Sequence, residues 1–91
     1  MNKTVQLNDN ELIQMFQQGN TRAFDALIDR HQERIYNAIL CMVKDSYLAE
    51  DLIQDIFIKI INNLKQKKYN DEGKFLPWAL RIAHNFCVDH F

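Results

Sequence analysis

The sequence predicts an all-α domain, a compact bundle of about four helices that spans residues 1–91, and three observations support this fold class. Apolar residues recur every three or four positions through most of the chain, as they do on one face of an α-helix. Turn-forming residues are scarce, because 91 residues include only two glycines and one proline. Apolar residues make up 47% of the chain and charged residues 25%, a balance typical of a folded soluble domain and not of a disordered one.

The first two predicted helices are separated at Gly19. Asn8 is a favourable N-cap and Glu11 follows three residues later, which predicts a capping box at the start of a short helix. Gly19 can end this helix in a left-handed conformation, and Asn20 can cap the next one. From Ala23 to Val43 the apolar residues keep a helical period, so we expect one long second helix.

The second half of the chain predicts two more helices. A break at Lys44–Ser46, with Asp45 or Ser46 as the cap, precedes a helix over roughly Tyr47–Leu64. Its apolar stripe is wider than one core needs, so we expect part of it to face a partner. The fourth helix is expected to begin at Pro77, because proline suits a first turn whose N–H groups have no intrahelical partner. Its core face is expected to hold Ala79, Ile82, Ala83 and Phe86, and its outer face Arg81, His84, Asn85 and Val88.

Neither an enzyme nor a bound metal or other cofactor is predicted. Glu50 and Asp51 are adjacent, and adjacent helical side chains point about 100° apart, so they do not form a catalytic pair. His84, Cys87 and His90 are spaced like metal ligands, but successive three-residue steps rotate around the helix and the ligands would diverge.

Cysteine usage and hydropathy predict a cytoplasmic protein with no membrane insertion. Cys41 and Cys87 both lie in apolar helical patterns, so we expect buried free thiols in a reducing cytosol. No apolar run reaches the roughly 18 residues of a membrane span. The sequence stops at Phe91 within a helical pattern, and we therefore expect a fragment of a longer protein.

Charge is segregated although the net charge is only −1. Residues 45–55 hold four acids and no base, and residues 59–74 hold five lysines and two acids, which suggests two different partners. In the acidic stretch, Asp51, Gln54 and Asp55 share a helix face with Ile58. This face is either an ordinary solvated surface or a docking surface for a basic helical partner.

The lysine-rich stretch is open to the same two interpretations. Its lysines either only increase solubility or hold phosphates while Tyr69, which lies among them, stacks on an unstacked base. The two remaining aromatic candidates, Trp78 and His31, are expected to pack in the core.

Three stretches carry a resemblance to a known family: ELIQMFQQGNTRAFDALIDRHQERIY, AEDLIQDIFIKI and KFLPWALRIAHNFCVDHF. From Asn8 onward the chain resembles region two of an extracytoplasmic-function (ECF) sigma factor of bacterial RNA polymerase. The resemblance implies a helical domain that docks on the clamp coiled coil of the polymerase beta-prime subunit. It also implies recognition and melting of the minus-ten promoter element, with a base of the non-template strand flipped out. The family also has a C-terminal helix-turn-helix domain, which we expect to be missing from this fragment.

The resemblance also implies roles for particular residues. Polymerase contacts fall on Asp51, Gln54, Asp55 and Phe57, with Ile58 beside them. Tyr69 matches a loop aromatic at the pocket for the flipped base, and Asn85 and Asp89 match polar readout positions. The full set of expected DNA contacts is Lys67, Lys68, Tyr69, Lys74, Arg81, His84, Asn85 and Asp89. The alternative is a helical interaction module, bound for example by an anti-sigma factor, with no direct role at DNA.

Overall fold

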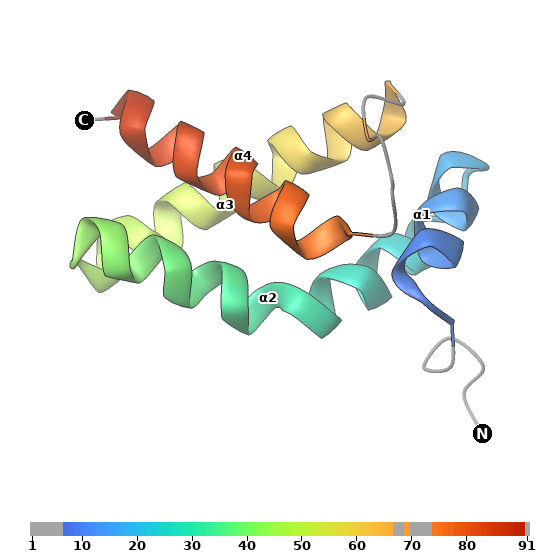
Figure 1. Cartoon of the computed structure of the whole chain (residues 1–91), viewed down its shortest axis with the longest axis horizontal. Coiled ribbons are helices and arrows are strands. Elements are labelled where there is room, and N and C mark those ends of the chain that lie inside the picture. Colours follow the sequence, from blue (N-terminus) through green and yellow to red (C-terminus); the bar gives the residue numbers. More distant parts are fainter. Residues whose placement is uncertain (1–6, 67–68, 70–73, 91) are drawn as a thin grey trace.

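The chain folds as a bundle of helices in the computed structural model, which describes residues 7–66, 69 and 74–90. These residues form four α-helices and no strand, so the predicted fold class is confirmed (Figure 1). Helices α2, α3 and α4 pack on one another, and α1 lies across one end of this group and packs mainly on α2. The helix bounds are α1 Asp9–Gln17, α2 Thr21–Val43, α3 Ser46–Lys65 and α4 Phe75–His90.

The predicted cap residues fix the ends of α1 and the start of α2. The Asn8 side chain accepts the Glu11 N–H at 2.9 Å, and the Glu11 carboxylate accepts the Asn8 N–H at 3.1 Å, which completes the capping box. Gly19 follows α1 with φ at 108°, a conformation that favours glycine. Asn20 caps α2 by accepting the Ala23 N–H at 3.2 Å.

The turn between α2 and α3 is closed by Asp45. Of the two predicted cap residues, Asp45 is the one used, because its carboxylate accepts the N–H groups of Tyr47 and Leu48 at 3.0 and 3.2 Å. Lys44 ends α2 in a left-handed conformation with φ at 56°. These two residues let the chain reverse direction within a very short connection.

Helix α4 begins at Phe75, two residues before the predicted start at Pro77. Pro77 still lies in the first turn, where a missing N–H costs no intrahelical hydrogen bond. The buried face of α4 also differs from the prediction. Residues at four-residue steps are buried, and the expected core residues Ile82 and Phe86 are only half-buried at its edge. The buried residues of α4 are Phe75, Ala79, Ala83 and Cys87.

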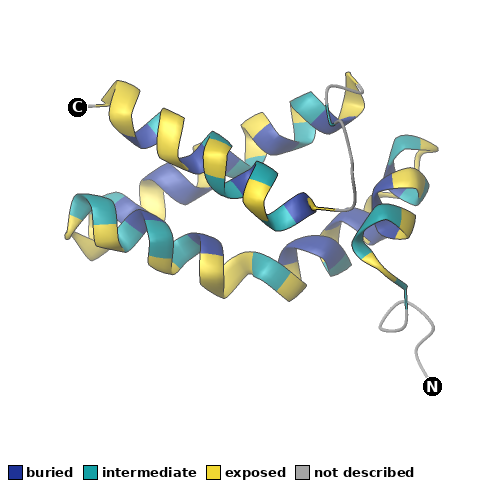
Figure 2. Ribbon diagram, in the orientation of Figure 1, coloured by how far each residue is buried: buried dark blue, intermediate teal, exposed yellow. Residues whose placement is uncertain are grey.

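The core receives large side chains from α1, α2 and α3 and mostly small ones from α4. All four helices contribute buried residues to it (Figure 2). No polar or charged residue is buried in the part of the chain that the structure describes. The core is therefore held by apolar packing, and polar chemistry is left to the outer faces. Its fully buried residues include Leu12 of α1, Leu27, Ile35 and Ile39 of α2, and Ile56, Ile60 and Leu64 of α3.

The two cysteines differ, which corrects the prediction that both are buried. Cys87 is buried, but Cys41 is exposed. The reason is the orientation of α2, because Asn37 and Lys44, four residues before and three after Cys41, are exposed on the same side of the helix. Among the described residues, no helix combines the length and the hydropathy that a membrane span requires.

Candidate protein and nucleic-acid interfaces

The outer face of α3 presents four of the five residues predicted to contact polymerase. Asp51, Gln54, Asp55 and Ile58 are all exposed, and we call this set the α3 surface. Their spacing of three, one and three residues places them along one side of the helix. Phe57 is half-buried and packs against the core, so it lies at the edge of this surface. Ile58 is 56% exposed, which is high for a large apolar residue.

Sequence reasoning missed one residue that extends the α3 surface, Tyr47. Its side chain is 82% exposed, the highest exposure among the large hydrophobic residues that the structure describes. Tyr47 lies four residues before Asp51 and therefore on the same side of α3. The sequence does contain a signal for Tyr47. The three- and four-residue spacing of the α3 surface reaches Tyr47 when it is continued by one turn toward the N-terminus. Exposed aromatic residues such as Tyr47 are enriched in protein-binding surfaces.

The outer face of α4 presents the second predicted set. Arg81, His84, Asn85 and Val88 are exposed at the same three-, one- and three-residue spacing, and we call this set the α4 surface. Val88 is 52% exposed and adds an apolar group to the polar ones. Asp89 and Lys74 are also exposed, Asp89 four residues after Asn85 and Lys74 directly before the helix.

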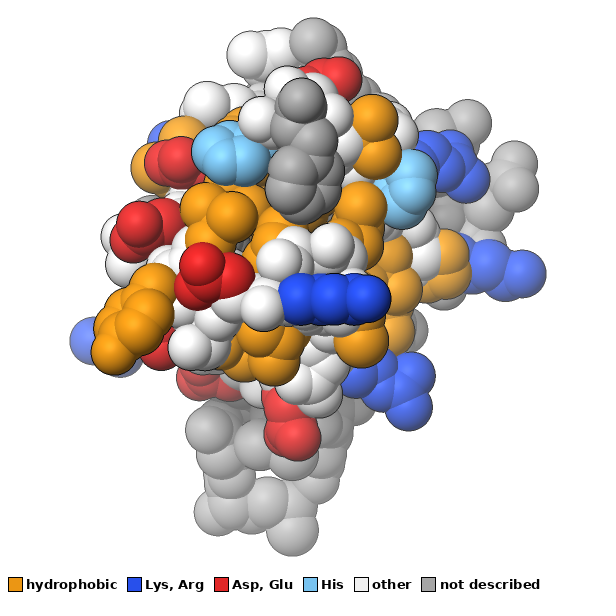
Figure 3. Space-filling view, turned by 90° about the vertical axis from the view of Figure 1, so that its left-hand side faces the viewer, with side chains coloured by type: hydrophobic (Ala, Val, Ile, Leu, Met, Phe, Trp, Pro, Cys, Tyr) orange, Lys and Arg blue, Asp and Glu red, His pale blue; other side chains and the backbone are white. Residues whose placement is uncertain are grey.

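Acidic and basic side chains are unevenly distributed over the end of the molecule where α2 joins α3 (Figure 3). In this view most acidic side chains lie left of centre, whereas basic side chains lie at the centre and on the right and in smaller number on the left, with hydrophobic side chains among them (Figure 3). The net charge is close to zero, but the α3 surface carries two acids and the α4 surface carries an arginine, so the two surfaces differ in charge.

A shallow groove adjoins the α4 surface. It lies between α2 and α4, has a volume of about 390 Å³, and has a mostly apolar lining. Arg81 and His84 belong to both the groove and the α4 surface, so the two are continuous. The rest of its lining is Ala38, Ile39, Met42, Pro77, Leu80 and Ala83.

Tyr69 is half-buried in a small aromatic cluster. Its ring meets Trp78 edge-on, with centroids 4.9 Å apart, and Phe75 edge-on at 6.2 Å. Its hydroxyl donates a hydrogen bond to Asn10 of α1 at 3.2 Å. Trp78 packs against the core as predicted. The two neighbouring lysines predicted to contact DNA, Lys67 and Lys68, lie outside the described residues.

The three residues with metal-ligand spacing on α4 do not converge. Cys87 is completely buried in the core, whereas His84 and His90 are exposed. Burial raises the pKa of the Cys87 thiol, which keeps it protonated and makes it a poor ligand or nucleophile. In residues 7–66, 69 and 74–90 no three side chains of the metal-binding types come together.

Comparison with known proteins identifies the family. The family model described as "Sigma-70 region 2" matches residues 27–91. The chain belongs to this family. The RNA polymerase sigma-H factor of Pseudomonas aeruginosa is 34% identical to this region 2 domain over 94% of the chain and 44% of the relative. The ECF RNA polymerase sigma-E factor of Haemophilus influenzae is 31% identical over 93% of the chain and 43% of the relative.

A solved structure supports the same assignment. It is the NMR structure of an engineered region 2 of sigmaE in complex with GTAAAA, and it is 30% identical to this region 2 domain. The two superpose with a TM-score of 0.83 over 93% of this chain and 86% of the other. The resemblance to region two of ECF sigma factors is thus confirmed. The chain spans less than half the length of the two curated relatives.

Proposed function

We propose that this region 2 domain acts in transcription initiation by docking on core RNA polymerase and by recognising and melting the minus-ten promoter element. The observation that carries the proposal is the presence of two exposed surfaces of different chemistry on neighbouring helices, the α3 surface and the α4 surface. The relatives support it because they are named RNA polymerase sigma factors, and the solved relative holds a short oligonucleotide. Its place of action is then the bacterial cytoplasm, with polymerase.

The α3 surface suits a basic helical partner such as the clamp coiled coil of the beta-prime subunit. Asp51 and Asp55 supply negative charge that steers the approach and sets the register of docking. Ile58 and Tyr47 supply apolar area that is exposed before docking and covered after it. The acids attract the partner at long range, and the apolar groups lose water when the two surfaces meet. A purely charged surface lacks this second contribution.

The α4 surface suits a DNA strand whose bases are accessible. Arg81, with Lys74 before the helix, can hold phosphates, which positions the strand without reading its sequence. Asn85 carries the amide that pairs with base edges through two hydrogen bonds, and His84 and Asp89 offer further polar contacts. Flipping a base out costs a few kcal/mol, and stacking on an aromatic ring such as that of Tyr69 can offset this cost. A net charge of −1 is compatible with this role, because docking on polymerase supplies most of the affinity.

A second candidate function follows from the exposed apolar groups of α3. Tyr47 and Ile58 would fit a protein partner other than polymerase, such as an anti-sigma factor that covers the same surface. In this case the domain would be an interaction module and α4 would have no direct role at DNA.

The test is the double substitution Gln54→Ala/Asp55→Ala, with Gln32→Ala/Glu33→Ala as the matched control. The control pair is also a glutamine followed by an acid on an exposed helix face, but on α2. We expect the α3 variant to lose binding to core polymerase, while its thermal stability and oligonucleotide binding stay at the wild-type level. Equal polymerase binding by both variants would contradict docking through α3, and a collapse of stability would show that the face is core.

A further inference from the structure

Helix α1 contacts the aromatic cluster that holds Tyr69. The hydrogen bond from Tyr69 to Asn10 joins residues 59 positions apart in the sequence, so it fixes the Tyr69 side chain against a different helix. The Tyr69 ring is also restrained by edge-on contacts with Trp78 and Phe75. The Tyr69 side chain is held by a hydrogen bond from its hydroxyl and by two ring contacts, so few orientations remain open to it.

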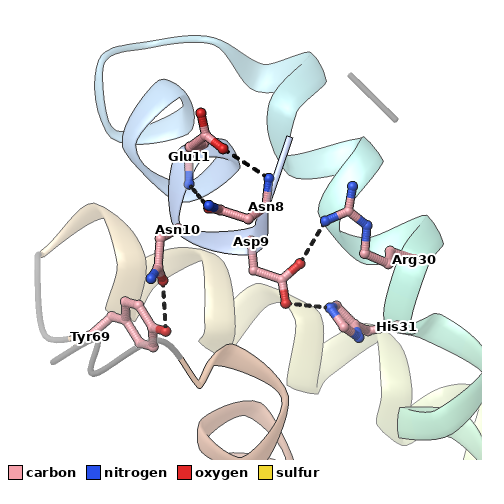
Figure 4. A network of polar contacts seen from close by, with 7 residues as sticks. All are labelled: Asn8, Asp9, Asn10, Glu11, Arg30, His31 and Tyr69. Carbon is pink, nitrogen blue, oxygen red and sulfur yellow. Dashed lines mark hydrogen bonds and ion pairs between the residues drawn. The ribbon is translucent and has the colours of Figure 1, made fainter. Parts of the chain in front are cut away.

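The first turn of α1 is itself anchored to α2. The Asp9 carboxylate pairs with Arg30 at 2.9 Å and with His31 at 2.8 Å (Figure 4). The capping box orders the backbone here, so that Asp9 and its neighbour Asn10 point to two different partners, α2 and Tyr69. The Asn10 amide, which accepts the hydrogen bond from Tyr69, therefore belongs to a helical turn that is itself held in place by α2.

These contacts form a closed ring. From α1 the ring passes through Asn10 to Tyr69, from Tyr69 to Phe75, and from Phe75 to His31, whose ring centroid lies 5.5 Å away. His31 returns to α1 through its contact with Asp9. A ring of contacts resists rearrangement better than a chain, because no member can move without disturbing two others.

From this geometry we propose that α1 positions Tyr69 for DNA, with Asn10 as the positioning residue. The proposal rests on the proposed function, in which Tyr69 stacks on a base. Holding the ring before DNA arrives lowers the entropy cost of immobilising it on binding. Loss of the Asn10 side chain should then weaken binding by about three- to tenfold, the effect of freeing one such side chain.

The test measures binding of a fluorescein-labelled, single-stranded hexanucleotide pool of randomised sequence to the full chain at low salt. We expect Asn10→Ala and Tyr69→Phe to weaken binding equally and the double variant to lose no more than either. Asn10→Asp keeps an acceptor oxygen and should restore binding. Gln14→Glu adds the same charge to an exposed position of α1 and should not weaken binding to the level of Asn10→Ala.

The variant Tyr69→Ala separates failure of this proposal from failure of the proposed function. If Tyr69→Ala binds like wild type, Tyr69 is not a DNA contact and the assigned role is wrong. If Tyr69→Ala weakens binding but Asn10→Ala does not, only the positioning role of α1 is overturned. Tighter binding by Asn10→Ala would also overturn it, because Asn10 would then hold Tyr69 away from DNA.

Discussion

Helices α3 and α4 share one core but contribute to it differently. The buried face of α3 carries large aliphatic residues such as Ile56 and Ile60, whereas α4 buries alanines and a cysteine beyond its first residue, Phe75. Small residues allow the backbone of α4 to lie close to its neighbours. Most fully buried positions of α3 therefore remove larger side chains from water than those of α4 do. Beyond Phe75, the larger apolar residues of α4, Trp78 and Phe86 among them, are only half-buried against the core.

The outer faces of the two helices differ in charge and share a geometry. Each presents four exposed residues at the same spacing, but the α3 surface carries two acids and the α4 surface carries Arg81, a histidine and an amide. The same spacing on two neighbouring helices thus carries two surfaces of different chemistry, as the proposed function requires.

The largest effect on stability is expected for a substitution on the inner face of α3. Ile56→Ala should lower the free energy of unfolding by about 2–5 kcal/mol, because it leaves a cavity at a residue that is fully buried. Ile58→Ala is the matched control on the same helix and should change it by less than about 0.5 kcal/mol, since Ile58 is exposed. Urea unfolding measures both. Similar losses for the two variants would mean that α3 does not have distinct inner and outer faces.

An intermediate effect is expected on the outer face of α4. Asn85→Ala should weaken oligonucleotide binding by about 1–3 kcal/mol for preferred sequences and little for others, because an amide reads base edges. Arg81→Ala should weaken binding to all sequences and reduce the salt slope by about 1, because the proposed function assigns Arg81 a phosphate contact. Fluorescence anisotropy with a set of hexanucleotides at several salt concentrations measures both. If Asn85→Ala weakened binding equally for all sequences, Asn85 would contact the DNA backbone and not the bases.

Local signals predicted much of the fold. The capping box at Asn8, the cap at Asn20 and one of the two caps proposed before α3 are confirmed, because each depends on residues close in sequence. Periodicity also placed both outer surfaces correctly on the exposed sides of their helices. The start of α4 was misplaced at Pro77, since proline is tolerated anywhere in a first turn and does not mark its first residue.

Contacts between distant segments were not predictable in the same way. The hydrogen bond between Asn10 and Tyr69, and the pairing of Asp9 with His31, depend on how α1 lies across the bundle. Periodicity shows which residues share a face of one helix but not which neighbour covers that face. The same limit explains Cys41, whose apolar surroundings in sequence did not reveal that its side of α2 is uncovered.

The smallest expected effect tests the buried face of α4. Cys87→Ala should lower the free energy of unfolding by about 1 kcal/mol, close to the value of one buried methylene-sized group and well below the loss for Ile56→Ala. Cys41→Ala should have almost no effect, because that side chain is exposed. A loss for Cys87→Ala as large as that for Ile56→Ala would show that α4 contributes to the core as strongly as α3.

The same variant should change how stability depends on pH. Burial raises the folded-state pKa of Cys87 above its ordinary value of 9.0, so the unfolded chain releases the thiol proton at a lower pH than the folded one. The stability that the neutral thiol contributes is therefore complete below about pH 9 and is lost as pH rises through the folded pKa. Unfolding in urea at neutral pH and at about pH 10 should show a smaller alkaline loss for Cys87→Ala than for wild type or Cys41→Ala. An identical loss in all three would mean that the thiol ionises as readily in the folded core as in the unfolded chain.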